Sequence, residues 1–469
     1  MIVDVLTGPP GCGKSTVMRV EAVKQPGHYL FAYMTEKLLS EQAAEFRREV
    51  PFSTVVIEAH AKSPGHGTVQ KKLDAAAAQV NASRSKHAIV LITHTSLMAA
   101  DLAAFAGWHF RIDEAPAAVH SGLEKSKLVQ SYLRESFDLD AVGREGWHVL
   151  KRKAANAKTT WKSGEGLTSS QAELLNNAQR PNGVFVAADR LDGPFEWVSV
   201  WSPHVLDGLA ASVTVAGASY MSSIGALVAK RYADFCERPI PMSRTGQPNI
   251  SIHYFTEGHE GSTALWSRSE GRAFTVKLCD YLVSNAPHLG FWAANEPVAN
   301  LLEHRIAGTQ LSPKAAGQNE YRDRTSCAFI YSAQPTPNDR PLMELFGITD
   351  EEIRVARQDE DVLQFVMRGA IRNADYGGGY DIYLYSRSQA ERLRDQLVAS
   401  RVGSVEIAPA DAGFMDVARL SAGRAKALVV TSTSGRKIKA ASAKKTDRRH
   451  AQALAAGRVP GRAGRPKKA

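Results

Sequence analysis

A phosphate-binding loop at the start of the chain constrains the fold more than any other feature. An apolar stretch, residues 1–6, runs into Gly8-Pro9-Pro10-Gly11-Cys12-Gly13-Lys14-Ser15-Thr16. The glycines let backbone N–H groups surround a triphosphate, the lysine reaches its β- and γ-phosphates, and the Ser15 hydroxyl can bind Mg²⁺. Residues 16–23 are expected to form a helix whose N-terminus faces the anion. An ordinary glycine turn is the alternative, but strand, loop and helix in this order predict a site for ATP and Mg²⁺.

Strand and helix patterns alternate after this loop. Short apolar runs that predict strands occur at residues 29–33, 54–58, 87–94 and 108–112. The stretches between them, including residues 35–42 with Thr35 as a cap and residues 71–82, have helical patterns. Continuous apolar strands separated by helices are typical of a parallel sheet with crossover helices.

An acidic pair, Asp113-Glu114, follows the last of these strands. An acid at the end of a buried strand can hold Mg²⁺, and an adjacent acid can polarise the attacking water. We assign Asp113 to the metal, together with Ser15, and Glu114 to the water. The alternative is an exposed acidic pair stabilised by a helix dipole. The position of the pair after the phosphate loop favours the catalytic interpretation.

Together these motifs resemble those of the superfamily 2 helicases and translocases. The phosphate loop is similar to motif I, residues 35–42 resemble motif Ia, residues 92–97 resemble the next strand-end motif, and Asp113-Glu114-Ala115-Pro116 resembles the DEAx box. The resemblance implies two RecA-like domains that hydrolyse ATP between them. It also implies that Thr35, Lys37 and Thr93 contact a nucleic-acid backbone. The compact form looks like a DEAD-like phage or mobile-element member.

Residues 120–200 interrupt the alternation, and we expect a helical or irregular insertion there. Basic residues are interleaved with Trp147 and Trp161, which suits a strand-binding surface or, alternatively, solvated helices around two core tryptophans. The first domain, residues 1–240, then resumes at residues 212–219, in the position of motif III. Gly217-Ala218-Ser219 stands there instead of the family's usual Ser-Ala-Thr. A proline-containing segment, residues 238–248, is the expected linker.

A second RecA-like domain is predicted over residues 245–405, without a phosphate loop. Strands are expected at residues 250–255, 289–294, 326–331 and 380–385, and helices at residues 272–284, 297–304 and 389–399. Residues 289–294 occupy the place of motif IV. Residues 312–319 resemble motif V, with Asn319 where the family often has an aspartate.

Three polar residues late in the second half recur at intervals of four. Gln364, Arg368 and Arg372 are therefore expected on one face of a helix. The segment resembles motif VI, whose arginines cross the cleft and neutralise charge on the γ-phosphate, and this resemblance implies catalytic roles for all three. The family's second arginine usually follows the first after three residues, so the match is closer for Arg368. A basic helix face is the alternative.

Positive charge is concentrated at the C-terminal end of the chain. The formal net charge is +10, yet residues 421–469 contain 14 Lys or Arg and one acid, Asp447, so the first 420 residues are close to neutral. A tail of this kind binds polyanions. Gly464-Arg465-Pro466 resembles the core of an AT-hook, which implies that Arg465 enters an A·T minor groove. A disordered phosphate-binding tail over residues 410–469 is the alternative.

Composition excludes several other classes. The four cysteines have no CxxC spacing, so neither a zinc site nor a disulfide framework is indicated. No apolar run approaches the roughly 20 residues of a membrane span, and the chain begins without a basic leader. We therefore expect a cytoplasmic protein that does not enter a membrane.

The sequence predicts an ATP-dependent nucleic-acid helicase or translocase, acting on DNA in replication, recombination or repair, with RNA as a possible substrate. Only seven residues precede the phosphate loop, too few for the adenine-reading segment of DEAD-box RNA helicases, which favours DNA. The alternatives are a remodeller of protein–DNA complexes that does not unwind and an ATP-switched DNA-binding recruitment factor. Glu114 argues against the switch, and a P-loop kinase would not need a second domain with Arg368.

Overall fold

The computed structural model describes residues 1–64, 67–153, 160–164, 166–314 and 320–417. Met1–Val417 forms one compact unit. The expected AT-hook with Arg465, most of the expected tail, and residues 315–319 of the motif V resemblance lie outside the described residues. No helix in the described ranges is long and apolar enough to cross a membrane.

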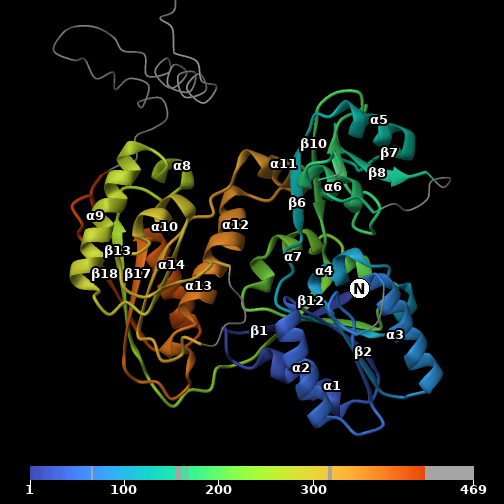
Figure 1. Cartoon of the computed structure of the whole chain (residues 1–469), viewed down its shortest axis with the longest axis horizontal. Helices are drawn as coiled ribbons and strands as arrows, with labels where there is room; N and C mark the ends of the chain where they lie inside the picture. Colours follow the sequence, from blue (N-terminus) through green and yellow to red (C-terminus); the bar gives the residue numbers. More distant parts are fainter. Residues whose placement is uncertain (65–66, 154–159, 165, 315–319, 418–469) are drawn as a thin grey trace, which may run out of the picture. The chain divides into compact units, whose positions relative to one another are not determined.

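The first half is built on a seven-stranded sheet in which every neighbouring pair is parallel (Figure 1). Its order is β12-β1-β11-β5-β2-β4-β3. The strands are β1 (Ile2–Thr7), β2 (His28–Tyr33), β3 (Val55–Glu58), β4 (Ala88–Thr93), β5 (His109–Asp113), β11 (Ser212–Ala216) and β12 (Asp234–Pro239). The helices are α1 (Lys14–Lys24), α2 (Glu36–Glu49), α3 (Val69–Ser83), α4 (His94–Ala99) and α7 (Ile224–Ala229).

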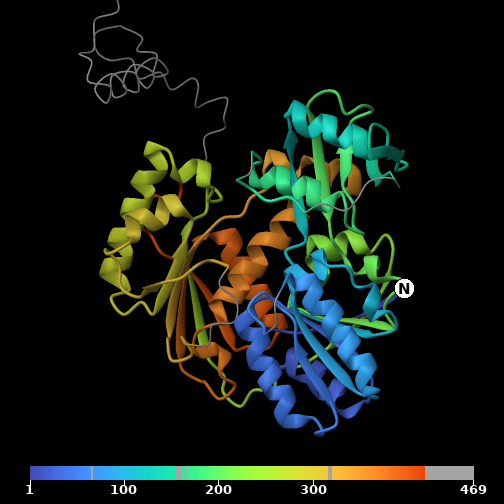
Figure 2. The same cartoon turned by 45° about the vertical axis from the view of Figure 1, so that its right-hand side comes forward.

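Alternation along the strands creates a core on each face of this sheet. Phe31 of β2 packs with α1 and α2, whereas its neighbours Leu30 and Ala32 pack on the other face with α3. Figure 2 shows helices on both sides of the sheet. Thr35 caps α2 as expected, because its hydroxyl accepts a hydrogen bond of 3.2 Å from the Leu38 N–H.

The insertion is a folded module, and the expectation of a helical or irregular segment was wrong. In the described residues it contains a five-stranded antiparallel sheet, β6-β10-β9-β8-β7. Its elements are β6 (Val119–Glu124), α5 (Lys127–Ser136), β7 (Phe137–Ala141), β8 (His148–Arg152), α6 (Ser169–Asn177), β9 (Phe185–Ala187) and β10 (Phe195–Val200). These strands have three to six residues with polar side chains interspersed, so they lack the apolar runs by which buried strands are identified.

The two tryptophans of the insertion serve its packing. Trp147 is buried in an apolar cluster, and Trp161 makes an edge contact with Tyr132 at 5.0 Å between ring centroids. Lys151 Nζ lies 3.1 Å from an Asp140 carboxylate oxygen. The packing of the two tryptophans agrees with the alternative of core residues, and strand binding by the basic side chains stays a prediction.

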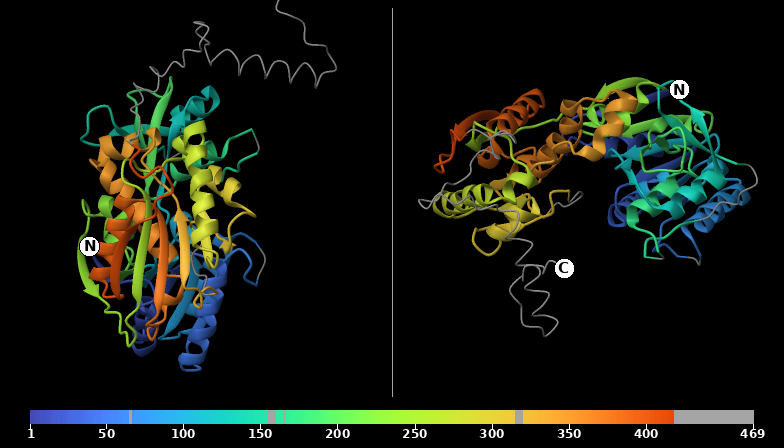
Figure 3. Two further views of the ribbon diagram at one scale, coloured as in Figure 1. Left: turned by 90° about the vertical axis from the view of Figure 1, so that its left-hand side faces the viewer. Right: turned by 90° about the horizontal axis from the view of Figure 1, so that it is seen from above.

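The second half is built on a six-stranded parallel sheet, β15-β14-β16-β17-β13-β18. Its strands are β13 (Asn249–Thr256), β14 (Phe291–Ala294), β15 (Thr309–Gln310), β16 (Ser326–Ile330), β17 (Gly379–Ser386) and β18 (Ser404–Pro409). Its helices are α8 (Thr263–Trp266), α9 (Ser269–Asn285), α10 (Glu296–Leu302), α11 (Arg340–Phe346), α12 (Asp350–Arg354), α13 (Glu360–Val366) and α14 (Arg387–Ala399). Helices α9 and α10 cover one face, and α13 and α14 cover the other (Figure 3).

Two parallel sheets flanked by helices confirm the predicted fold class of two RecA-like α/β domains. Strand β12 continues to Pro239, which lies opposite Thr7 of β1, so the segment between the two sheets begins at residue 240. Proline is tolerated there because β12 is an edge strand and Pro239 is its last residue.

Candidate active site

The phosphate loop joins β1 to α1 at the carboxyl edge of the first sheet, where parallel α/β sheets bind ligands. Gly8, Gly11 and Gly13 have φ values of 144°, 85° and 93°, which side chains with a Cβ rarely adopt. A Cβ on Gly8 would also lie 2.5 Å from the Ile240 carbonyl oxygen, whereas one on Gly13 would have no atom within 4 Å. The loop therefore needs glycine for its backbone and leaves open space beside residue 13.

Lys14 is buried and closes the loop on itself. Its ammonium group donates to the carbonyl oxygens of Gly8 at 2.7 Å and Pro9 at 3.0 Å. These acceptors are neutral, so the positive charge of the lysine is available to an anion held by the loop.

Ser15 and Asp113, the two residues assigned to the metal, are in direct contact. The Ser15 hydroxyl donates to Asp113 Oδ1 at 2.5 Å. Burial and, secondly, the charge of Glu114 raise the pKa of Asp113 to about 7, against the hydrogen bond from Ser15 and the charge of Lys14. A hydroxyl beside a carboxylate is a donor set that suits Mg²⁺, so these residues fit the metal that the phosphate loop implies.

Glu114 has an unusual backbone conformation. Its φ of 67° places a non-glycine residue in the left-handed region, and its N–H donates to the Ala216 carbonyl at the end of β11 at 2.6 Å. Strained backbone of this kind is concentrated at functional sites. Burial raises the pKa of Glu114, while Lys14, Gln364 and Arg372 oppose the shift.

Gln364 reaches this site from the second half of the chain. Its side-chain amide donates to the Glu114 carboxylate at 3.3 Å. The two residues are separated by 250 positions in sequence. The contact brings α13 against the carboxyl edge of the first sheet.

Arg372 also reaches the phosphate loop, but not from the expected helix. A Cβ placed on Gly11 would lie 3.2 Å from Arg372 Cγ and 3.4 Å from its Nε. Helix α13 ends at Val366, and Arg372 lies in a separate 3₁₀ turn, Ala370–Arg372. The expectation of three residues on one helical face was therefore wrong. The change of direction occurs at Gly369, where a Cβ would lie 2.1 Å from the Tyr380 hydroxyl oxygen.

Arg368 is placed differently from its two companions. It is buried, with its guanidinium 5.3 Å from the centre of the Phe365 ring. Burial lowers the pKa of Arg368 to about 10, although the charge of Asp361 opposes the shift. The structure thus brings Gln364 to Glu114 and Arg372 to the phosphate loop, and it packs Arg368 within the second half.

Unpaired nitrogen atoms mark where an anion would fit. Arg372 Nε and Arg368 Nη1 are both buried without a hydrogen-bond partner among the described residues. Of the two, Arg372 Nε lies beside Gly11, and buried guanidinium groups bind phosphate oxygens strongly. The loop, the lysine and this arginine therefore form a cradle that fits a nucleotide phosphate.

Two residues of the site were missed by the sequence analysis. His94 is buried, and its Nε2 lies 2.8 Å from the Asp113 carbonyl oxygen; burial lowers the pKa of His94 to about 4, so the ring is neutral and supports the Asp113 backbone. Burial and, secondly, the negative charge of Glu114 raise the pKa of Glu360 in α13 to about 8. The position of His94 at the end of β4 could have indicated it, whereas nothing local indicates Glu360.

The expected nucleic-acid contacts lie on the same edge of the first sheet. Thr35 and Lys37 are exposed at the start of α2, after β2. Thr93 follows the neighbouring strand β4 and caps α4 through the Ser96 N–H at 3.2 Å. They are near in the fold, and no contact in the structure tests their role.

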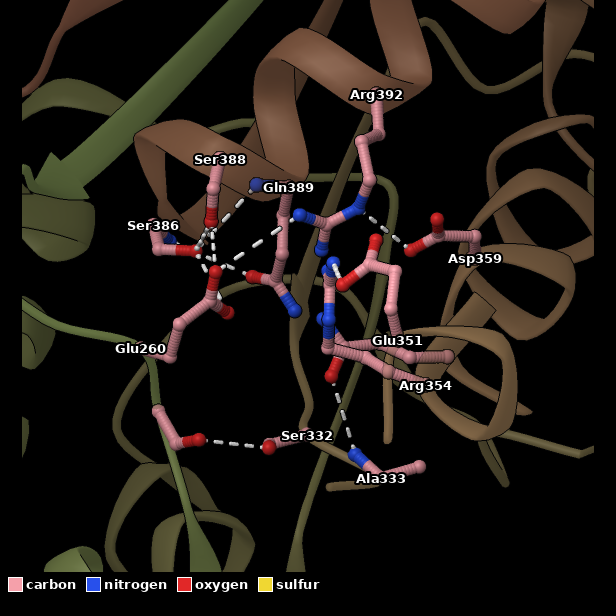
Figure 4. Close-up of polar contacts among 12 residues, drawn as sticks. Glu260, Ser332, Ala333, Glu351, Arg354, Asp359, Ser386, Ser388, Gln389 and Arg392 are labelled. Carbon is pink, nitrogen blue, oxygen red and sulfur yellow. Dashed lines mark hydrogen bonds and ion pairs between the residues drawn. The ribbon is translucent and has the colours of Figure 1, made fainter. Parts of the chain in front are cut away.

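A second polar cluster lies at the carboxyl edge of the second sheet (Figure 4). Arg392 Nε donates to Asp359 Oδ1 at 2.9 Å, and Gln358 accepts a hydrogen bond of 3.3 Å from the Ala333 N–H. Asp359 and Gln358 belong to a π-helical turn, Val355–Asp359, directly before α13. The cluster therefore fixes the start of the helix that carries Glu360 and Gln364.

Comparisons with known proteins give similarity at the level of structure alone. No protein-family model and no curated protein matches the sequence. A solved XPD helicase is similar with a TM-score of 0.47 and 10% identity, covering 87% of this chain and 96% of that one. Xpd4 of S. tokodaii has a TM-score of 0.45 and 12% identity, covering 86% and 96%. A DEAD box protein from Methanococcus jannaschii has a TM-score of 0.27 and 10% identity, covering 87% of each chain. We therefore infer function from the residues of this chain.

Proposed function

We propose that this chain is an ATP-dependent nucleic-acid helicase or translocase that acts on DNA. The observation that supports the proposal best is the meeting of the phosphate loop and Glu114 with Gln364 and Arg372 from the second half. A phosphate loop alone would suit many nucleotide-binding proteins. In the proposed enzyme, side chains from the second sheet would contact the same phosphates as the loop. This contact would couple ATP hydrolysis to the separation of the two domains. We take residues 1–240 and 245–405 as these domains.

Each residue would have a distinct role in hydrolysis. Lys14 and the glycine N–H groups would hold the phosphates of ATP. Ser15 and Asp113 would hold Mg²⁺, which supplies neutralisation of phosphate charge. Glu114 would take the proton of the attacking water, while Gln364 would orient the Glu114 carboxylate. Arg372 would neutralise charge that develops on the transferred phosphoryl group.

We propose DNA as the polymer that the protein binds and moves along, for two reasons. The carboxyl edge of the first sheet offers Thr35, Lys37 and Thr93 beside the nucleotide site, which suits contact with a backbone. The basic residues 421–469, with Arg465, suit additional binding to duplex DNA. RNA remains the competing polymer in the test.

The proposal is tested by steady-state ATP hydrolysis with and without single-stranded DNA, duplex DNA and RNA. We expect stimulation by DNA. We expect Glu114→Gln to lower kcat by roughly 100-fold or more, because it removes the proton acceptor, while ATP binding is retained. Arg372→Ala should lower kcat strongly, whereas Arg368→Ala should act chiefly on stability, because its guanidinium packs on Phe365.

Three outcomes would decide against parts of the proposal. ATP binding without hydrolysis under any condition would refute the motor and leave an ATP-switched recruitment factor. Hydrolysis stimulated by DNA without strand displacement would indicate translocation or remodelling without unwinding. Stimulation by RNA alone would refute the DNA assignment.

A further inference from the structure

The segment between β12 and β13 contacts both halves of the candidate site. We call residues 240–246 the linker strap. At its first end the Ile240 N–H donates to the Thr7 carbonyl at 2.7 Å. The Ile240 carbonyl oxygen is the atom that leaves no room for a Cβ on Gly8. The first end of the strap therefore packs against the phosphate loop.

At its other end the strap holds the turn that carries Arg372. The Arg244 guanidinium donates through Nη1 to the Ile371 carbonyl at 2.6 Å and through Nη2 to the Asn373 carbonyl at 2.8 Å. These two carbonyl groups flank Arg372 on either side. A planar guanidinium with several fixed donors suits such a pair of acceptors better than an ammonium group does.

Backbone hydrogen bonds also join the strap to the turn. The N–H groups of Thr245 and Gly246 both donate to the Ala374 carbonyl at 2.9 Å. A Cβ on Gly246 would lie 2.3 Å from the Tyr376 carbonyl oxygen and 2.4 Å from that of Asp375. The strap and the turn thus pack backbone against backbone, with no space for a side chain between them.

The contacts form a closed path. The phosphate loop contacts the strap at Ile240, the strap contacts the turn through Arg244, and Arg372 of the turn returns to the loop at Gly11. Helix α13 does not hold Arg372, because it ends six residues earlier and Gly369 intervenes. The strap therefore helps to fix the distance between Arg372 and the phosphate loop, together with the hydrogen bonds of the turn to the Arg324 and Arg322 carbonyl groups.

We propose that Arg244 is a positioning residue that fixes the turn around Arg372 and so aims the Arg372 guanidinium at the phosphate loop. The role in catalysis rests on the proposed function, whereas the fixing of the turn does not. Arg244 itself points to carbonyl groups and not to the phosphate cradle. It should therefore affect turnover more than nucleotide binding.

Kinetics provide the first test, with Arg238→Ala as the matched control. Arg238 lies close before the strap, and its guanidinium pairs with the Glu21 carboxylate at 2.6 and 2.9 Å on the exposed surface. We expect Arg244→Ala to lower kcat by roughly 10- to 100-fold, as small misplacements of catalytic groups do, with KM for ATP within about threefold of the parent. Arg238→Ala should leave both unchanged. A rise in KM with kcat unchanged would overturn the proposal.

A double variant separates positioning from a general structural effect. If Arg244 acts through Arg372, the kcat of Arg244→Ala with Arg372→Ala should equal that of Arg372→Ala alone. Arg244→Lys should restore part of the loss, since one ammonium group can reach one of the two carbonyls. Fully additive losses in the double variant would show that Arg244 acts elsewhere.

Hydrogen exchange of the full chain tests the turn without reference to activity. We expect Arg244→Ala to speed amide exchange in residues 369–376 while exchange in α1 stays as in the parent. Unchanged exchange in the turn, or equally faster exchange throughout the second sheet, would contradict local fixing by Arg244. If the parent chain does not hydrolyse ATP, the proposed function fails, and exchange in the turn still decides whether Arg244 fixes it.

Discussion

Three carboxyl groups lie around a single lysine at the phosphate loop. Burial is the largest cause of the raised pKa of Asp113, Glu114 and Glu360, and their mutual repulsion adds to the shifts of Asp113 and Glu360. Lys14 opposes all three shifts. A nearby cation favours the ionised form of a carboxyl group, so positive charge bound at the phosphate loop would lower these three pKa values.

The pKa of Asp113 predicts a pH dependence of stability in the absence of metal. Its pKa in the folded chain is about 7, above the ordinary value near 3.9 of an unfolded chain. The unfolded state therefore ionises first, and this carboxyl lowers stability as pH rises from about 4 to about 7. We expect Asp113→Asn to raise the melting temperature relative to the parent by a few degrees at pH 8 and least at pH 4.

Thermal unfolding followed by circular dichroism at several pH values, with a chelator present, measures this difference. Asp416→Asn, at an exposed position, is the control and should show no such trend. A stability difference for Asp113→Asn that is independent of pH would contradict the assigned cause.

Among the elements, α13 and the turn after it show how local geometry sets the site. The helix supplies Gln364, and the chain then changes direction where Gly369 lies under the Tyr380 ring. The Val366 carbonyl at the helix end accepts from the Tyr380 hydroxyl at 3.0 Å and, over a longer distance of 3.4 Å, from the Gly369 N–H. The turn that follows the helix therefore places Arg372 beside Gly11.

Gly369→Ala should disrupt the packing of this turn against Tyr380. Its Cβ would lie 2.1 Å from the Tyr380 hydroxyl oxygen and 2.5 Å from Cε2 of that ring, and the buried ring has little room to move. We expect a loss of about 1–3 kcal/mol in the free energy of unfolding, measured by urea denaturation. Gly379→Ala is the control, because a Cβ there meets nothing within 4 Å. Equal stability of the two variants would show that the turn can yield.

Across Met1–Val417, α11 of the second half is packed on the insertion of the first (Figure 1). Leu342 and Phe346 of α11 share an apolar cluster with Trp147 of the insertion and with α7. Phe346 makes an edge contact with Phe185 at 5.5 Å and lies 5.7 Å from the Arg231 guanidinium. The two halves are therefore joined at a point separate from the candidate active site.

Phe346→Ala should weaken this junction. Removing a buried aromatic ring leaves a cavity and should cost about 3–5 kcal/mol in stability, with faster hydrogen exchange in β9 and β10. Phe52 is fully exposed, so Phe52→Ala should stay within about 0.5 kcal/mol of the parent. Denaturation and hydrogen exchange of both variants measure the difference. If the two variants behave alike, α11 does not stabilise the insertion.

The sequence alone determined the parts of this protein whose structure depends on near neighbours. The phosphate loop, the Thr35 cap and the long apolar strands are recognisable because their backbone and burial follow from a few adjacent residues. The same is true of the acidic pair at the end of β5. These features predicted a parallel α/β sheet, and the resemblance that they carry predicted two such domains. Ser15 and Asp113, which were assigned to the same metal, are in contact.

Only the tertiary structure decided what depends on residues far apart in the chain. The insertion forms a sheet because its short strands pair with one another and bury Trp147, which no single strand reveals. Arg372, and not Arg368, reaches Gly11 because Tyr380 and Arg244 fix a turn where helical periodicity predicted a continuous helix. The Tyr380–Val366 and Arg244–Ile371 contacts join positions 14 and 127 residues apart along the chain, so local patterns could not determine them.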